Sequence, residues 1–227
     1  MKKLIGLGLT TIGAAFLLTS CGNDNTSTTT DKQDTSADQT STAKNNADTM
    51  SHGKSMNMSS SMMSSMNSSM EKLKNMSMTG DFDVDFANMM VEHHQSALEM
   101  AQVELSQGKD ETLKAKAQEI ITKQKKEQQE LRDFISGYKP SSMKHGEGEL
   151  QKSMSASMDK MKGMQMSGDV DKDFTMMMTR HHEDGISMAK MELKNGMSDK
   201  LKQMAQKIIN DQQKDIAEFK SWMSSHK

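Results

Sequence analysis

The sequence predicts an all-α protein, a four-helix bundle made of two repeated helical hairpins, preceded by a signal peptide and a disordered tether. First, Lys, Glu, Gln, Ala and Met are abundant beside one proline and 4% aromatic residues, which favours helix over sheet. Second, residues 70–138 and 158–226 align without a gap, with roughly 29 of about 69 positions identical. Third, a two-helix unit of this size can hardly bury its apolar face alone, so the two units are expected to pack together.

The bulk composition limits the function classes that fit this chain. A formal net charge of -2 over 227 residues gives no strong field for binding nucleic acid. Only 33% of the residues are hydrophobic and the mean hydropathy is -0.76, so part of the chain is expected to be unstructured. Methionine is present 27 times, an excess over its ordinary use as a gap filler in cores.

The N-terminus has the features of a secretory signal. Lys2 and Lys3 precede a short apolar stretch over residues 4–18, which is too short to span a membrane comfortably. It ends in Leu-Thr-Ser-Cys at Cys21, which resembles the bacterial lipoprotein cleavage box. The resemblance implies removal of residues 1–20, a lipid on Cys21, and a protein anchored at the extracytoplasmic face of a membrane.

Residues 21–69 are expected to form a disordered Ser/Thr/Met-rich tether, because they contain almost nothing to bury. Its second half carries Met and His among serines without a clean 3.6-residue period. We interpret this part as an arm that collects a soft metal ion. Low-complexity drift and an amphipathic helix with Met on one side are the alternatives. The donors singled out on the arm are Met50, His52, Met56 and Met58.

The hairpins are expected over residues 70–138 and 158–227, joined by a linker over residues 139–157. Acidic residues at 81–85 and 169–173 suit the start of each first helix. Gly108 and Gly196 are good stops for these helices. The linker adds His145 as a further candidate donor beside two methionines.

The main candidate site is the pattern Met-Met-x-x-His-His, which occurs once in each repeat. On a helix, residues three and four apart share a face, so these thioethers and imidazoles can meet on one surface. Methionine sulfur and imidazole nitrogen suit copper, particularly Cu(I). The predicted metal ligands are Met89, Met90, His93, His94, Met100, Met177, Met178, His181, His182 and Met188.

Neighbouring histidines cannot both face the bundle axis, because adjacent helical residues point about 100° apart. One of each pair is therefore expected to face the centre, and the other to serve a neighbouring helix, the surface or a supporting role. Further candidate donors come from the second helix of each hairpin, where oxygen ligands would also admit zinc or another divalent ion. They are Gln124, Glu127, Gln212 and Asp215.

These residues resemble a known bacterial family, domain of unknown function 305. The resemblance is carried by Asp-x-x-Phe at 83–86, Met-Met-x-x-His-His-x-x-Ala-x-x-Met-Ala at 89–101, and the Ala, Ile-Ile and Gln of the second helix, in both repeats. It implies an exported, ferritin-like four-helix bundle in a family with members linked to copper binding and tolerance. Gly185 in place of Ala97, and Asp215 in place of Glu127, are the departures.

We therefore expect a membrane-anchored extracytoplasmic protein that binds copper for buffering, sequestration or tolerance, with an unidentified copper exporter or chaperone as partner. Zinc and iron fit less well, and no enzymatic activity or nucleic-acid binding is expected. A ferritin-like iron oxidase is disfavoured because no Glu-x-x-His is aligned between the repeats. The alternatives are a Met-rich surface interaction or structural lipoprotein without metal, and a sacrificial sink for oxidants.

Overall fold

Helices make up the regular structure of the described part of the chain. The computed structural model describes residues 47–140, 148–161 and 163–226, with the backbone alone for residues 47–59, 158 and 161. Over these ranges it contains no strand, which confirms the all-α class. The helices are α1 (Ala47–Lys74), α2 (Phe82–Gln107), α3 (Glu111–Gly137), α4 (Glu149–Met161), α5 (Val170–Asn195) and α6 (Asp199–Ser225).

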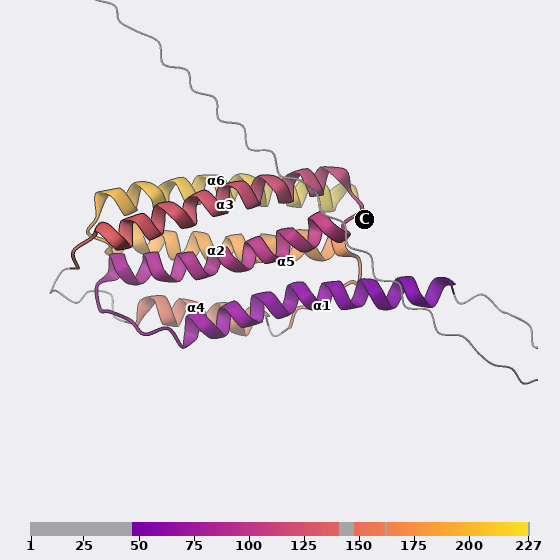
Figure 1. Ribbon diagram of the computed structural model, residues 1–227, viewed down its shortest axis with the longest axis horizontal. Coiled ribbons are helices and arrows are strands. Elements are labelled where there is room, and N and C mark those ends of the chain that lie inside the picture. Colours follow the sequence, from indigo (N-terminus) through magenta and orange to yellow (C-terminus); the bar gives the residue numbers. More distant parts are fainter. Residues whose placement is uncertain (1–46, 141–147, 162, 227) are drawn as a thin grey trace, which may run out of the picture. The chain divides into compact units, whose positions relative to one another are not determined.

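Four long helices form the two predicted hairpins. Helix α2 packs along α3, α5 packs along α6, and the hairpins meet where α2 lies against α5. Helices α1 and α4 pack against each other and against α5, and α1 also packs on α2. Figure 1 shows α2 and α5 as a middle layer, with α3 and α6 on one side and α1 and α4 on the other. The side chains of α2 and α5 are therefore buried from two directions.

The starts of α2 and α5 lie where the acidic residues predicted them. Asp81 caps α2 by accepting a hydrogen bond from the Val84 backbone, and Asp169 caps α5 in the same way. Such caps contribute about 1 kcal/mol each. Asp85 also accepts from the backbone nitrogens of Thr79 (2.7 Å) and Gly80 (3.0 Å), which fixes the turn into α2. These contacts set the register in which the first helix presents its histidines.

Gly108 and Gly196 do end α2 and α5, but for a different reason than the sequence suggests. Their φ angles of -61° and -64° are ordinary for any residue, so the left-handed conformation usual for such glycines is not needed here. Instead, a Cβ at Gly108 would collide with the carboxyl group of Glu104. The same relation holds between Gly196 and Glu192. Each glycine therefore leaves room for a glutamate that folds over the helix end.

The prediction of a disordered tether over residues 21–69 is wrong from residue 47 onward, because α1 begins there. Met62, Met66, Met70 and Leu73 are buried at spacings of three and four residues, as on one face of a helix. The amphipathic-helix interpretation is therefore correct for this part of the methionine-rich stretch. The serine-rich sequence does not indicate this helix, because α1 is stabilised mainly by packing on α2 and α5.

The linker predicted over residues 139–157 likewise contains the first nine residues of α4. Leu150 and Met154 are buried there, 88 residues after Met62 and Met66 of α1. Ser157 is buried at the position equivalent to Ser69. The repeated unit therefore has three helices and starts earlier than the aligned hairpins.

The predicted signal peptide over residues 1–20, Cys21 with its lipid, and the tether up to residue 46 lie outside the described residues. None of the helices in the described ranges combines the length and the apolar character needed to cross a membrane.

Candidate metal centre

The two halves of the protein meet at equivalent histidines. His93 of α2 and His181 of α5 stack with their ring centroids 3.7 Å apart and an angle of 28° between the ring planes. Because 88 residues separate them, as they separate the repeats, a local twofold axis passes between the two rings. The candidate centre therefore lies at the crossing of α2 and α5.

All ten residues of the predicted main site are buried, each with at most 1% of its surface exposed. The methionines are Met89, Met90, Met100, Met177, Met178 and Met188. Within each pair the imidazoles diverge, since the ring planes of His93 and His94 are tilted by 54° and those of His181 and His182 by 59°. As expected, one histidine of each pair faces the twofold axis and the other faces the second helix of its own hairpin.

These outer histidines meet acidic residues. His94 Nε2 lies 3.1 Å from Glu127 Oε2 on α3, and His182 Nε2 lies 3.4 Å from Asp215 Oδ2 on α6. The first distance is that of a hydrogen bond, and the second is longer than an ordinary one. Carboxylates in this position orient an imidazole and fix which nitrogen carries the proton. Glu127 and Asp215, predicted as additional metal donors, thus face histidines.

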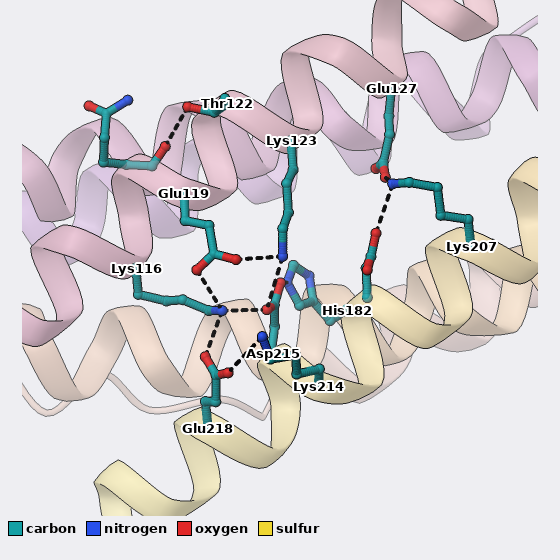
Figure 2. Close-up of polar contacts among 12 residues, drawn as sticks. Lys116, Glu119, Thr122, Lys123, Glu127, His182, Lys207, Lys214, Asp215 and Glu218 are labelled. Atoms are coloured by element: carbon teal, nitrogen blue, oxygen red, sulfur yellow. Dashed lines mark hydrogen bonds and ion pairs between the residues drawn. The ribbon is translucent and has the colours of Figure 1, made fainter.

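Each of these two carboxylates also pairs with a lysine from the opposite hairpin. Lys207 of α6 donates to Glu127 Oε1 at 2.8 Å, and Lys116 of α3 lies 2.5 Å from Asp215 Oδ1. Figure 2 shows both lysines reaching across between α3 and α6. Burial alone would raise the pKa of Glu127, but His94 and Lys207 lower it to about 2. His182 and Lys116 similarly hold the pKa of Asp215 at about 2 against the effect of burial. Both carboxylates are therefore ionised, and the neighbouring lysines compensate their negative charge.

The central histidines are neutral. Burial and the neighbouring imidazoles lower the pKa of His93 and of His181 well below the ordinary value, and the backbone of the opposite histidine offsets this only in part. Burial also lowers the pKa of His182, although Asp215 opposes the shift. Neutral imidazole is the form that binds a metal ion, because its free lone pair is the ligand.

Several buried polar atoms at the centre have no hydrogen-bond partner. The Nδ1 atoms of His94 and His181 are unpartnered, as are both ring nitrogens of His93 and of His182. Since Nε2 of His181 faces a backbone carbonyl oxygen, we place its proton there and its lone pair on Nδ1. Buried unpaired polar atoms are rare and call for an explanation. Lone pairs of this kind among buried thioethers fit a soft cation such as Cu(I).

One amide side chain lies beside a central histidine, because Gln212 and His93 both approach Gly185. Gln212 is buried and neither amide atom has a partner, and the same holds for Oε1 of Gln124. Both were predicted as additional donors. In the described ranges, no group of three or more His, Cys, Asp or Glu side chains is arranged to hold a metal ion. The donors shown at the centre are therefore imidazole nitrogens and the Gln212 amide, and the motif methionines are buried in the core on the same two helices.

Comparison with known proteins places these repeats in a family. Residues 23–135 and 136–223 each match the family described as domain of unknown function (DUF305). This chain is a DUF305 protein. The boundary between the two matches falls in the last turn of α3, so the matched segments hold α1 to α3 and α4 to α6, in agreement with a three-helix repeat.

Solved structures of CopM are also similar to the chain. CopM in the Cu(I)-bound form is 25% identical, covers 63% of this chain and 96% of its own, and has a TM-score of 0.49. CopM in the Cu(II)-bound form is 26% identical, with 63% and 97% covered and a TM-score of 0.49. CopM in the Ag-bound form obtained by soaking is 26% identical in sequence, covers 63% of this chain and 96% of its own, and has a TM-score of 0.49. Among curated proteins, none matches the chain.

The structure of this DUF305 protein adds residues that the sequence analysis did not single out. Ser96 lies 2.9 Å from His181 Nε2 through its Oγ atom, and Lys116 and Lys207 neutralise the buried acids. Ser96 follows the double histidine by two positions and was open to recognition as part of the motif. The lysines were not, because their partners lie 80 to 99 residues away on another hairpin.

The remaining predicted donors are not placed. Met50, His52, Met56 and Met58 belong to the first turns of α1, where the structure describes the backbone only. His145 lies outside the described residues.

Proposed function

We propose that this DUF305 protein binds copper, as Cu(I), at the crossing of α2 and α5, and that it buffers or sequesters the ion outside the cytoplasm. The observation that carries the proposal is the group of four buried histidines with unpartnered ring nitrogens at the crossing of two helices that also bury six methionines. The copper ion is the cargo of the protein, and no reaction is assigned to it.

The chemistry of the donors favours copper over zinc and iron. Thioethers are soft, uncharged ligands that suit Cu(I), and neutral imidazoles accept the same ion. Imidazole also suits zinc and iron, but thioether sulfur is a soft ligand that suits Cu(I) better than either of them. The two carboxylates nearest the centre, Glu127 and Asp215, are already neutralised by lysines. An iron oxidase would need these acids as ligands, so we do not propose that activity, nor any other enzymatic one.

The surrounding residues would hold the ligands ready. Glu127 and Asp215 fix the orientation of His94 and His182, so that Nδ1 of each is left for the ion. His181 is fixed through its Nε2, which lies 2.8 Å from the backbone oxygen of His93. Because the outer layers of helices exclude water, an ion entering the centre exchanges its hydration shell for these donors. Preorganisation of this kind lowers the entropy cost of binding.

We also propose that the protein is a lipoprotein held at the extracytoplasmic face of a membrane. The support is the sequence alone: two lysines, the apolar residues 4–18 and the Leu-Thr-Ser-Cys box at Cys21. An exported copper binder without a cysteine in its site avoids disulfide formation outside the cell. Handover of the ion to an exporter or chaperone completes the proposal.

A Met-rich interaction surface is the competing function, and the described methionines favour it less. Among the described residues, the exposed large hydrophobic side chains are those of Met197 and Met223. The methionines next to the histidines are in the core instead. A contact surface would need its methionines exposed.

The test is a titration of the full-length chain with Cu(I) against a chelator of known affinity. Replacing His93, His94, His181 and His182 by glutamine should weaken the tightest binding event by at least about a hundredfold. The exposed His226, replaced by glutamine, is the matched control and should change nothing. Helix content by circular dichroism identifies a variant that fails to fold. A folded fourfold variant with unchanged affinity would refute the assigned centre.

A further inference from the structure

The two central histidines have different surroundings although they occupy equivalent positions. His181 Nε2 lies 2.8 Å from the backbone oxygen of His93 and 2.9 Å from Ser96 Oγ. Ser96 itself donates to the backbone oxygen of His93 at 2.9 Å. Since a carbonyl oxygen can only accept, the His181 ring is held with its proton on Nε2. This ring is fixed from the side of the first repeat.

His93 lacks the equivalent support. Neither of its ring nitrogens has a hydrogen-bond partner of ordinary geometry, although the side chain is 1% exposed, and the backbone of His181 acts on this ring only enough to offset part of the fall in its pKa. The residue equivalent to Ser96 is Asp184, which turns away from the twofold axis. Asp184 Oδ1 accepts from Ser157 of α4 at 2.6 Å and from the guanidinium of Arg180. Helix α4, the first helix of the second repeat, thus engages the side chain at the position that in the first repeat fixes a histidine.

The space beside His93 also differs between the repeats. A Cβ built at Gly185 would lie 2.6 Å from Gln212 Oε1 and 3.1 Å from His93 Cε1. Real Cβ atoms do not approach an oxygen that closely, so the Gln212 amide lies where it does because position 185 is a glycine. The equivalent residue of the first repeat is Ala97, which carries the methyl group that Gly185 lacks.

His93 and Gln212 are therefore two unsatisfied side chains on either side of one glycine. Both amide atoms of Gln212 and both ring nitrogens of His93 are buried and unpartnered. Burying so many polar atoms without partners costs free energy, and a bound cation would recover part of it by taking a lone pair from each. A glycine inside α5 costs helix stability as well, which a role in binding would explain.

We propose that the DUF305 protein binds one copper ion at its centre, displaced from the twofold axis toward His93, with the Gln212 amide as a second donor and Gly185 as the residue that makes room for it. This inference rests on the proposed copper function and specifies where the ion sits. The His181 ring is held in place on the other side of the site. The equivalent position in the first repeat, beside Ala97, binds no second ion. The duplication has thus given one asymmetric site in place of two equal ones.

The experiment uses two matched pairs of variants in the full-length chain, each titrated with Cu(I) in competition with a chromophoric chelator. The first pair is Gly185→Ala and Gln212→Ala, and the second, at the equivalent positions, is Ala97→Gly and Gln124→Ala. We expect the first pair to weaken the tightest binding event by about 10- to 100-fold, the usual size for a residue that supports a metal site. The second pair should change it by less than about threefold.

A double variant sharpens the result. Gly185→Ala acts by displacing the Gln212 amide, so Gly185→Ala combined with Gln212→Ala should bind copper no more weakly than either single variant. Circular dichroism separates this loss of affinity from unfolding. Alanine is a better helix former than glycine, so Gly185→Ala should keep the helix content of the wild type.

Three outcomes would overturn the inference. Equal losses from both pairs would indicate a symmetric site, and no loss from either would remove Gln212 and Gly185 from it. Two equivalent tight ions abolished by His93→Gln and His181→Gln separately would indicate two sites. In each of these cases the wild type still binds copper and the proposed function stands. A wild type that binds no copper at all would refute both proposals.

Discussion

The centre of the bundle and its two ends bury acidic groups in opposite ways. At the centre, Glu127 and Asp215 face lysines and histidines, and the pKa of each is held at about 2. At the ends, Glu104 and Glu192 face the aspartates Asp171 and Asp83 of the opposite hairpin. Burial, with the neighbouring aspartate, raises the pKa of Glu104 to about 8 and that of Glu192 to about 9.

The comparison shows that burial alone does not decide the charge of an acid in this fold. Asp171 accepts hydrogen bonds from the backbone nitrogens of Lys109 and Asp110 at the start of α3, where the helix dipole favours an acidic side chain. The adjacent Glu104 is buried beside Asp171, and Lys114 opposes the rise of its pKa only in part. The central acids are paired with cations, whereas the end acids lie beside acidic groups of the opposite hairpin, which raise their pKa.

The largest effect is expected from breaking the central ion pair at its most buried lysine. Lys116 is 7% exposed and Asp215 is 4% exposed in their side chains, so Lys116→Met leaves a buried carboxylate without its closest cation. We expect a loss of about 3 kcal/mol in the free energy of unfolding, measured with chemical denaturant. Lys126→Met, which removes an exposed pair with Glu130, is the control and should cost less than about 0.5 kcal/mol. A loss as small as that of the control would contradict the picture of the centre.

The next largest effect is a pH-dependent change in stability at the ends of the bundle, where Glu104 is buried. A glutamate whose pKa is raised in the folded state stabilises the protein below about pH 4.5, and this contribution is lost as the pH rises through about 8. Glu104→Gln, which resembles the protonated side chain, should therefore be more stable than the wild type at pH 8.5 by about 1 kcal/mol or more. The two should be equally stable near pH 4.5. A variant that is less stable at both values would show that Glu104 is ionised in the folded state.

A smaller effect is expected at the second central lysine. Lys207 is 52% exposed, so water screens its pairing with Glu127. Lys207→Met should lower the free energy of unfolding by about 1 kcal/mol, clearly less than Lys116→Met does. Thermal unfolding of the two variants side by side gives the order. The reverse order would mean that exposure does not govern the strength of the central pairs.

Much of this architecture could be predicted from the sequence. The duplication, the acidic starts of α2 and α5, and the buried stripe that includes Phe86 and Met90 all follow from helical periodicity. These features are local, so the residues that determine them lie within a few turns of each other. The split between an inner and an outer histidine followed from the 100° step between neighbouring residues.

The parts that could not be predicted depend on distant partners. Helix α1 is rich in serine, and its apolar face has meaning only against α2 and α5. The pairing of Lys207 with Glu127 joins residues 80 positions apart, and no local pattern marks it. The contact of Gly185 with Gln212 is of the same kind, since the sequence shows an unusual glycine but not the amide beside it.

X-ray absorption at the copper edge of the Cu(I)-loaded full-length chain tests the central claim most directly, because it reports the atoms bound to the ion. We predict a mixed shell of imidazole nitrogen, amide oxygen and thioether sulfur, whose imidazole signal falls when His93 and His181 are replaced by glutamine. A shell of sulfur alone, or one unchanged by that replacement, would contradict the account and place the ion away from the crossing of α2 and α5.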